Sequence, residues 1–390
     1  MKVLFVIHHL KMGGAETIVT NYALQMKKMG IEVAVLDIWH FNTILFQKLK
    51  NASIPVFSIF KESNIITRII NHLYPSKTSL NERIMNVISE YKPDVVHFHT
   101  FLGDTQIDKE LCPKWFFTLH SDMNRFLSQF DEIEIDNFSN QLSAGLHVLA
   151  LTGKAKQDLL AFNSKTQVDV IPNGLDIQGI QLQKYDKEKL LGELNLPKDT
   201  FILGHVGRFN KVKNHEKLIN IFRSILQKHP QSVLLLVGDG DKNDRKRVHG
   251  LVEEYSLQDR VIFLGVRKDA IALMSCFDAM ALPSYQESFS LVLVEAQAQG
   301  VRCVASDTVP DEVICTDKCF KLSVNESNKK WANLLLSSCV RENNVKSVNY
   351  FDFKKVLSNI LSLYQNPVSK EQICVEAEVP ADRLWQEIAR

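Results

Sequence analysis

Short apolar runs rich in Val, Ile, Leu and Phe alternate along the chain with segments of helical periodicity. Runs of this length that end at Gly, Pro or polar turns are typical of buried strands. Apolar residues also recur every three to four positions, as at Ile18, Tyr22, Met26 and Met29, which predicts helices between the runs. The first series of predicted strands occupies residues 2–7, 32–38, 54–59, 95–99, 115–119, 146–151 and 168–171.

A second series begins at Thr200, with predicted strands at 201–206, 232–237, 261–264, 279–282, 301–305 and 319–322. Alternating strands and helices favour an α/β fold in which helices cover both faces of a parallel sheet. Two series in 390 residues indicate two doubly wound, Rossmann-like domains that face a cleft. The polar stretch up to about Lys198 is predicted to be irregular. We assign domains to 1–175 and 176–366, with a helical tail at 367–390 that packs back on the first domain.

The stretch from Pro283 to Gly300 carries the most unusual pattern of the chain. A helix is predicted to begin at Ser288 or Ser290, either of which can cap it, and it is apolar almost all round. Glu295 lies in the middle of this helix, and Glu287 lies just before it, near the positive end of the helix dipole. A buried carboxylate is costly unless it is paired. The pair indicates either a polar-ligand site or a buried ion pair together with a surface Glu.

A basic loop follows the first strand of the second series, from Gly207 to His215. Its cations precede a predicted helix, where free backbone N–H groups also point outward. This combination suits a diphosphate, and Arg208 and Lys213 are the two side chains expected to touch it. The alternative is an ordinary solvated loop. Gly13 and Gly14, at the first strand-to-helix turn, would likewise let a ligand approach the backbone closely.

Histidines stand at the ends of two predicted strands of the first series. Ligands of open α/β sheets bind at the carboxyl ends of the strands. We interpret His97 and His99 first as packed, hydrogen-bonded residues. For His120 a catalytic role and a packing role are both open, because imidazole titrates near neutral pH.

Composition narrows the class of function. The formal net charge is +1, so no nucleic-acid partner is indicated. The cysteines are odd in number, 7, which fits reduced thiols and not a disulfide framework. Cys315 and Cys319 have no second pair at zinc-like spacing, so no metal site is predicted. The apolar run at the N-terminus is too short for a signal peptide, and no run is long enough to span a membrane.

Together these motifs resemble the retaining glycosyltransferases of family 4, which have the GT-B architecture. The resemblance covers nearly the whole chain. It rests on the glycine pair at Gly13, the basic loop, the segment from Ile171 to Asp176, and above all Glu287 followed after seven residues by Glu295. Ser288 departs from the Gly that often follows the first of these glutamates in the family.

The resemblance implies roles for individual residues. Arg208 and Lys213 would hold the donor diphosphate, Glu287 the donor sugar and Glu295 the ribose. His120 matches the active-site histidine of the family and would touch the sugar. The remaining implied donor contacts are Gly13, Gly14, Asn173, Val266 near the base, and the segment Ser288, Phe289, Ser290 and Leu291 through its backbone N–H groups.

The implied reaction is front-face retention, in which the acceptor hydroxyl attacks on the side of the leaving group and needs no metal cofactor. The substrates would be a nucleotide diphosphate sugar, with UDP favoured, and a saccharide or lipid-linked saccharide acceptor. We expect a cytoplasmic enzyme of capsular, exopolysaccharide or lipopolysaccharide synthesis at the inner leaflet. An amphipathic stretch from Lys61 to Arg83 offers either a membrane contact or an ordinary inward-packing helix.

Two other readings remain open. The non-hydrolysing nucleotide-sugar epimerases share the two-domain layout, but they would need an acid/base carboxylate pair in the N-terminal cleft, and no clear pair is seen. A catalytically inactive nucleotide-sugar-binding partner subunit is the non-enzymatic alternative. The presence of His120, Arg208, Lys213 and both glutamates argues against it.

Overall fold

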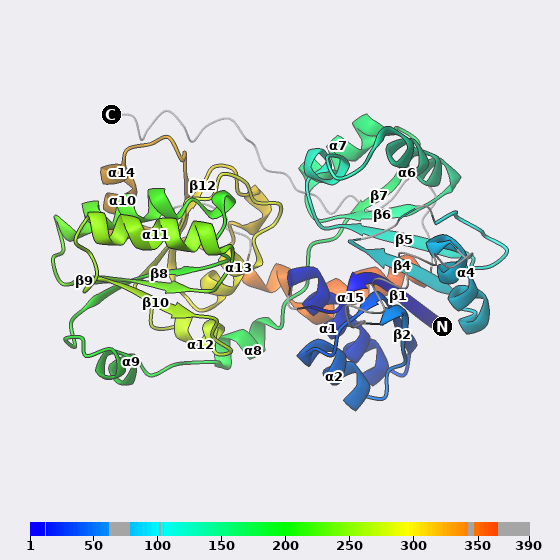
Figure 1. The fold of residues 1–390 in the computed structure, drawn as a ribbon, viewed down its shortest axis with the longest axis horizontal. Coiled ribbons are helices and arrows are strands. Elements are labelled where there is room, and N and C mark those ends of the chain that lie inside the picture. Colours follow the sequence, from blue (N-terminus) through cyan, green and yellow to red (C-terminus); the bar gives the residue numbers. More distant parts are fainter. Residues whose placement is uncertain (12, 62–78, 101–102, 104, 342–346, 366–390) are drawn as a thin grey trace.

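The computed structural model describes residues 1–365 apart from 12, 62–78, 101–102, 104 and 342–346. The described chain forms two lobes side by side, each built on one sheet (Figure 1). Each predicted strand is present, with bounds within about two residues of those expected. The two doubly wound sheets confirm the predicted α/β fold class.

The N-terminal sheet has seven parallel strands in the order β3-β2-β1-β4-β5-β6-β7. The order reverses direction beside β1, which is the position where ligands of doubly wound sheets bind. The strands are β1 (Lys2–His9), β2 (Glu32–His40), β3 (Val56–Lys61), β4 (Val95–His99), β5 (Lys114–Leu119), β6 (His147–Ala150) and β7 (Gln167–Val170).

The C-terminal sheet has six parallel strands in the order β10-β9-β8-β11-β12-β13. Its switch point lies between β8 and β11, so the loops after these two strands share one end of the sheet. The strands are β8 (Phe201–Val206), β9 (Ser232–Val237), β10 (Val261–Gly265), β11 (Ala279–Leu282), β12 (Arg302–Ser306) and β13 (Cys319–Leu322).

Helices cover both faces of each sheet, because right-handed crossovers that run in opposite directions from the switch point place their helices on opposite faces. Those of the first lobe are α1 (Gly14–Lys28), α2 (Ile44–Asn51), α4 (Leu80–Tyr91), α5 (Met123–Leu127), α6 (Glu132–Ala144) and α7 (Gly153–Phe162). Those of the second are α8 (Ile177–Leu182), α9 (Lys187–Glu193), α10 (His215–Leu226), α11 (Lys242–Glu254), α12 (Ala270–Met274), α13 (Leu291–Ala298) and α14 (Asn328–Leu336).

The segment between the two series was predicted to be irregular, and this prediction is wrong. The segment contains α8 and α9, which are capped by Asp176 and Asp186, and both carboxylates accept hydrogen bonds from backbone N–H groups of the first turn. These helices are too short for their periodicity to stand out in the sequence. Ile180 and Leu190 fix them by packing into the core of the second lobe.

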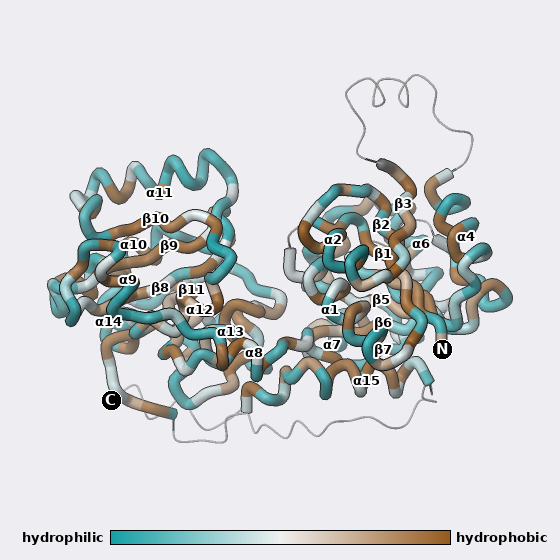
Figure 2. Tube along the Cα trace, turned by 90° about the horizontal axis from the view of Figure 1, so that it is seen from below, coloured by the Kyte–Doolittle hydropathy of each residue, from teal (hydrophilic) through white to brown (hydrophobic). Residues whose placement is uncertain are grey.

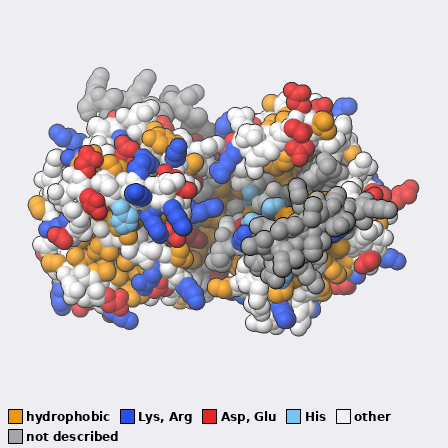
Figure 3. Space-filling model, viewed as in Figure 1, with side chains coloured by type: hydrophobic (Ala, Val, Ile, Leu, Met, Phe, Trp, Pro, Cys, Tyr) orange, Lys and Arg blue, Asp and Glu red, His pale blue; other side chains and the backbone are white. Residues whose placement is uncertain are grey.

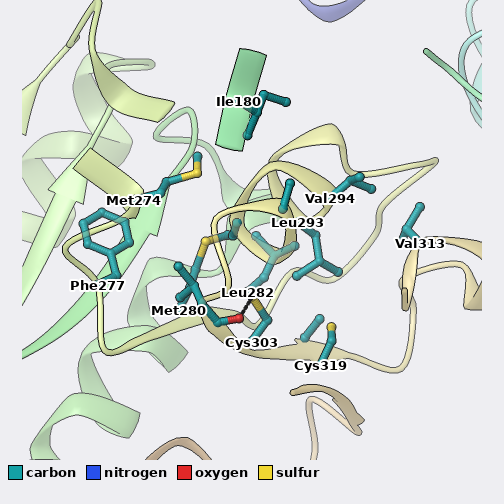
Figure 4. Packing of buried hydrophobic residues seen from close by; sticks show 14 of the residues in the cluster. Ile180, Met274, Phe277, Met280, Leu282, Leu293, Val294, Cys303, Val313 and Cys319 are labelled. Carbon is teal, nitrogen blue, oxygen red and sulfur yellow. Dashed lines mark hydrogen bonds between the residues drawn. The ribbon is translucent and has the colours of Figure 1, made fainter. Parts of the chain in front are cut away.

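Buried apolar side chains form a core on each face of each sheet. The strands are largely hydrophobic along their length, whereas most residues of α11 are hydrophilic (Figure 2). Around α13, Leu293 packs beside Leu282 and Cys303 of the sheet (Figure 4). Each described cysteine is a free thiol.

The last described helix, α15 (Phe353–Gln365), returns from the second lobe to the first (Figure 1). Val356, Ile360 and Tyr364 pack with residues of β1 and α1 in the core of the first lobe. This helix therefore ties the two lobes together by burial of its apolar face. The tail at 367–390 lies outside the described residues, as does most of the amphipathic stretch, residues 62–78. Across the described part of the chain, no helix is long and apolar enough to cross a membrane.

Candidate active site

The loops that follow β8 and β11 meet through an ion pair between two predicted site residues. Nζ of Lys213 donates a hydrogen bond to Oε1 of Glu287 over 2.7 Å. The hydroxyl of Ser284 donates to the same oxygen, also at 2.7 Å. Both charged side chains are largely buried, with exposed fractions of 17% for Lys213 and 9% for Glu287. The second oxygen of Glu287 thus remains available while the first is held by two donors.

Arg208 lies on the same loop as Lys213 but stays exposed. No hydrogen bond or ion pair is formed by its guanidinium with any described residue. The short 3-10 turn from Lys211 to Lys213 is fixed by Asn210, whose side chain accepts from the backbone N–H of Lys213. The loop after β8 therefore combines the fixed cation of Lys213 with the free guanidinium of Arg208, which suits a bidentate oxyanion.

The N-terminus of α13 carries backbone strain. Ser290, the residue before the helix, has φ of 67° and is in the left-handed region. Its side chain makes no capping bond, so the predicted serine cap is wrong in its chemistry although the helix begins there. The Ser290 hydroxyl is buried without a partner among the described residues. Such strain persists only where the surroundings impose it, and it is frequent at functional sites.

Glu295 lies in the second turn of α13, partly buried. Burial raises the pKa of its carboxyl to about 7. Within the described chain no Lys or Arg is paired with this carboxyl, and no hydrogen bond to either of its oxygens is formed. Of the two readings of this glutamate, a hidden ion pair is therefore not supported by the described residues. An unpaired carboxylate of this kind is available to a hydroxyl-bearing ligand.

The first lobe presents its own loops to this site across the hollow between the lobes (Figure 3). A side chain at Gly14 would contact Cδ1 of Leu291, the first residue of α13, at 3.5 Å. The carboxylate of Asp122 accepts a hydrogen bond of 2.7 Å from the amide of Gln286, next to Glu287. The structure thus brings the glycine turn to the start of α13, and Asp122 to the loop that carries Glu287.

His120 stands at the end of β5, two residues before Asp122. Its Nε2 atom lies 2.9 Å from Nδ1 of His99, at the end of the neighbouring strand β4. Burial lowers the pKa of His120 to about 4, so the imidazole is neutral at pH 7. His97 and His99 are fully buried and hydrogen-bonded, as interpreted from the sequence.

The remaining predicted donor contacts differ in how much they can contribute. Phe289 is buried and its ring packs against Phe351, which leaves only its backbone for a ligand. Val266 is 75% exposed after β10, at the same end of the sheet as Arg208. Asn173 is buried, and Ser288 is partly buried.

A cavity of about 450 Å³ was not anticipated from the sequence. It lies beside the ends of β9 and β10 and is lined by Phe209, Gly238, Lys242, Arg245, Lys246, His249, Phe263 and Gly265. Its cations come from one face of α11, where they repeat at three- to four-residue spacing. That spacing is the signal that could have identified them. Among the described residues no cluster of three or more His, Cys, Asp or Glu is placed to hold a metal ion.

Comparison with known proteins agrees with this fold. The family model of Glycosyltransferase Family 4 matches residues 12–178, and that of Glycosyl transferases group 1 matches residues 186–339. The putative glycosyltransferase EpsF of Bacillus subtilis (strain 168) is 27% identical over 352 residues, which cover 86% of each chain. The UDP-Gal:alpha-D-GlcNAc-diphosphoundecaprenol alpha-1,3-galactosyltransferase of Escherichia coli is 29% identical over 217 residues, covering 51% of this chain and 54% of that protein.

Solved structures show the same architecture. HepE of Anabaena, in complex with UDP, has a TM-score of 0.71 at 22% identity and covers 94% of this chain and 100% of its own. WaaG, a glycosyltransferase involved in lipopolysaccharide biosynthesis, has a TM-score of 0.64 at 14% identity, covering 93% and 95%. The fold and these matches define a GT-B glycosyltransferase. The chain belongs to glycosyltransferase family 4 and is a nucleotide-sugar-binding enzyme.

Proposed function

We propose that this enzyme moves a hexose or N-acetylhexosamine from a UDP-sugar to a lipid-linked saccharide, with retention of the anomeric configuration. The pathway would be the synthesis of capsular polysaccharide, exopolysaccharide or lipopolysaccharide. The observation that carries the proposal is the Lys213–Glu287 pair at 2.7 Å, beside a guanidinium and a carboxylate that have no partner among the described residues. A donor with a diphosphate, a ribose and a sugar would satisfy these groups together.

The cations would neutralise the diphosphate as it leaves. Arg208 is free to bind two phosphate oxygens, and Lys213 adds a fixed positive charge next to it. The free backbone N–H groups at the start of α13 point outward from the positive end of the helix dipole. Glu295 would accept from the ribose hydroxyls, and Glu287 would bind a sugar hydroxyl through its second oxygen.

The reaction would break the bond between the anomeric carbon and the phosphate oxygen and form a bond from that carbon to the acceptor oxygen. The proton of the acceptor hydroxyl would pass to the leaving phosphate oxygen on the same face. We propose that no metal cofactor is required, because Arg208 and Lys213 supply positive charge where the leaving group develops negative charge. Unchanged turnover in EDTA is the expected result.

The choice of substrates is supported by proteins similar to this chain. HepE of Anabaena has been solved with UDP and with UDP-glucose. The Escherichia coli relative is named for transfer from UDP-Gal to a diphosphoundecaprenol-linked sugar. A lipid-linked acceptor would bring the enzyme to the inner face of the plasma membrane as a cytoplasmic, peripheral protein. The epimerase and inactive-subunit alternatives are not favoured by these relatives.

Thermal-shift screening against UDP, GDP and their hexose conjugates tests the donor. A UDP-sugar should raise the Tm, since a ligand that binds only the folded state stabilises it. Transfer to a lipid-linked acceptor, with the anomeric configuration of the product read by NMR, tests the reaction. Turnover of the nucleotide sugar without an acceptor, yielding an epimer, would point to the alternative enzyme class.

Site variants need exposed controls of the same residue types. Lys213→Ala and Glu287→Ala should each abolish most transfer. Lys198 and Glu188 form an exposed ion pair of 3.5 Å, and Lys198→Ala and Glu188→Ala should transfer at the wild-type rate. Wild-type activity in both site variants would show that the assigned site is wrong.

A further inference from the structure

His120 is connected to a buried row of polar groups that the proposed reaction does not itself require. Nδ1 of His99 lies 2.9 Å from Nε2 of His120, and the ring centroids of His99 and His97 are 4.2 Å apart. Nε2 of His97 lies 2.7 Å from the hydroxyl of Thr118, and its Nδ1 bonds the hydroxyl of Tyr364 on α15. These interior groups are buried, so water cannot readily replace their hydrogen-bond partners.

Both imidazoles of the His99–His120 pair are neutral near pH 7. Burial lowers the pKa of His120 to about 4 and holds the pKa of His99 well below its usual range. A neutral imidazole carries one N–H and one bare nitrogen. Only one proton can therefore lie between Nδ1 of His99 and Nε2 of His120, and its owner fixes the tautomers of both rings.

The other nitrogen of His99 decides between the two arrangements. Nε2 of His99 is buried and has no partner among the described residues. If His120 donated, His99 would have to carry its own proton on this buried Nε2, as an N–H with nothing to accept it. If His99 donates from Nδ1, its Nε2 is a bare lone pair. Unpaired buried N–H groups are rarer in proteins than under-satisfied acceptors.

We propose that His99 is a positioning residue that fixes the tautomer of His120, so that His120 presents Nδ1–H as a hydrogen-bond donor. Nδ1 of His120 makes no hydrogen bond with any described residue, and the side chain is only partly buried, so a ligand can reach this nitrogen. His120 would donate to an oxygen of the bound substrate and would not take a proton from the acceptor. This second statement rests on the proposed function, whereas the tautomer does not.

The tautomer can be measured without substrate. Two-bond nitrogen–proton correlation spectra of protein labelled with ¹⁵N-histidine distinguish the protonated nitrogen of a neutral ring from the bare one. The chain has 12 histidines, so His120→Ala and His99→Leu assign the two rings by loss of signal. Both rings are expected to carry their proton on Nδ1. A wild-type His120 protonated on Nε2 would overturn the proposal.

Variants at position 99 then separate positioning from packing. In His99→Leu the constraint is gone, so the Nε2–H form of His120 should appear, and kcat should fall on the order of ten- to a hundredfold with little change in donor KM. His99→Asn places an amide N–H close to where Nδ1–H was and should keep the Nδ1–H tautomer and most of kcat. A His120 tautomer unaltered by His99→Leu would show that His99 does not set it.

Tyr364→Phe is the matched control for disturbance of the buried row. It removes the bond to His97 and leaves the His99–His120 pair in place. The His120 signals should stay those of the wild type. If transfer is absent from the wild type but the Nδ1–H tautomer is observed, the function fails and the positioning role stands.

Discussion

Lys213 and Glu287, 74 residues apart, form a 2.7 Å ion pair that joins the loop after β8 to the loop after β11. The two strands are neighbours in the sheet, so their carboxyl ends deliver both side chains to one place. Both groups are largely buried, so loss of the pair should lower stability. The same pair also holds Lys213 and Glu287 in position in the proposed donor site.

Replacing one member of this pair should destabilise the protein more than replacing both members. Lys213→Met or Glu287→Gln alone leaves one charge without its partner and is expected to lower the free energy of unfolding by about 1–3 kcal/mol, less than for a fully buried pair. The double variant should be less destabilised than the sum of the two. Urea unfolding of the four proteins measures this coupling, and strict additivity would contradict it.

Glu295 should make the protein less stable as the pH rises from about 4.5 to 7. The unfolded chain releases the proton of this carboxyl near its ordinary pKa of 4.5, whereas the folded protein holds it until about pH 7. The folded state thus binds more protons in this window, and its stability falls as the pH increases.

Glu295→Gln should therefore be more stable than the wild type at pH 8, by roughly 1–3 kcal/mol, and equal to it below pH 4.5. It should also weaken binding of UDP at pH 8, since the amide replaces a carboxylate acceptor. Stability curves of the two proteins that run parallel from pH 4.5 to 8 would contradict the shifted pKa.

His215 should make the protein less stable as the pH falls, the opposite of the effect of Glu295. Burial lowers the pKa of its imidazole to about 2 in the folded protein, and the unfolded chain takes up a proton near 6.5. Stability is therefore lost as the pH falls below 6.5. The ring of His215 is stacked on Phe209 at an interplanar angle of 10°. His215→Phe preserves an aromatic ring and should reduce the loss at pH 5 by about 2 kcal/mol, measured by denaturant unfolding at pH 5 and 7.5.

Gly14→Ala should separate folding from donor binding. A methyl group there would lie 3.5 Å from Leu291, an ordinary contact, so the Tm should stay close to that of the wild type. The same methyl would occupy space that the proposed diphosphate needs, and the donor KM should rise at least about tenfold.

Gly192→Ala is the control for Gly14→Ala, because a methyl group at Gly192 in α9 meets nothing within 4 Å. It should leave transfer unchanged and be neutral or stabilising by about 0.4–1 kcal/mol. An unchanged donor KM in Gly14→Ala would remove Gly14 from the proposed site.

The strands and the fold class could be predicted from the sequence because hydrophobic periodicity is a local property. Runs such as Val95–His99 and Ala279–Leu282 carry their own signal in the residues that form them. The basic loop and the two glutamates, Glu287 and Glu295, could likewise be singled out from residue types and spacing. The helices α8 and α9 were missed, because their order depends on contacts with the rest of the second lobe.

Only the tertiary structure decided which side chains from distant parts of the chain contact each other. Nothing in the sequence indicates that Lys213 holds Glu287 while Arg208 stays free, or that Gln286 reaches Asp122 of the other lobe. His99 was interpreted as a packing residue. The order of the sheet places it beside His120 at the ends of adjacent parallel strands, and burial then fixes the charge of both rings. The sequence by itself determined which elements form and which chemical groups stand at their ends. The strand order determined which groups meet, because neighbours in a parallel sheet come from separate parts of the chain.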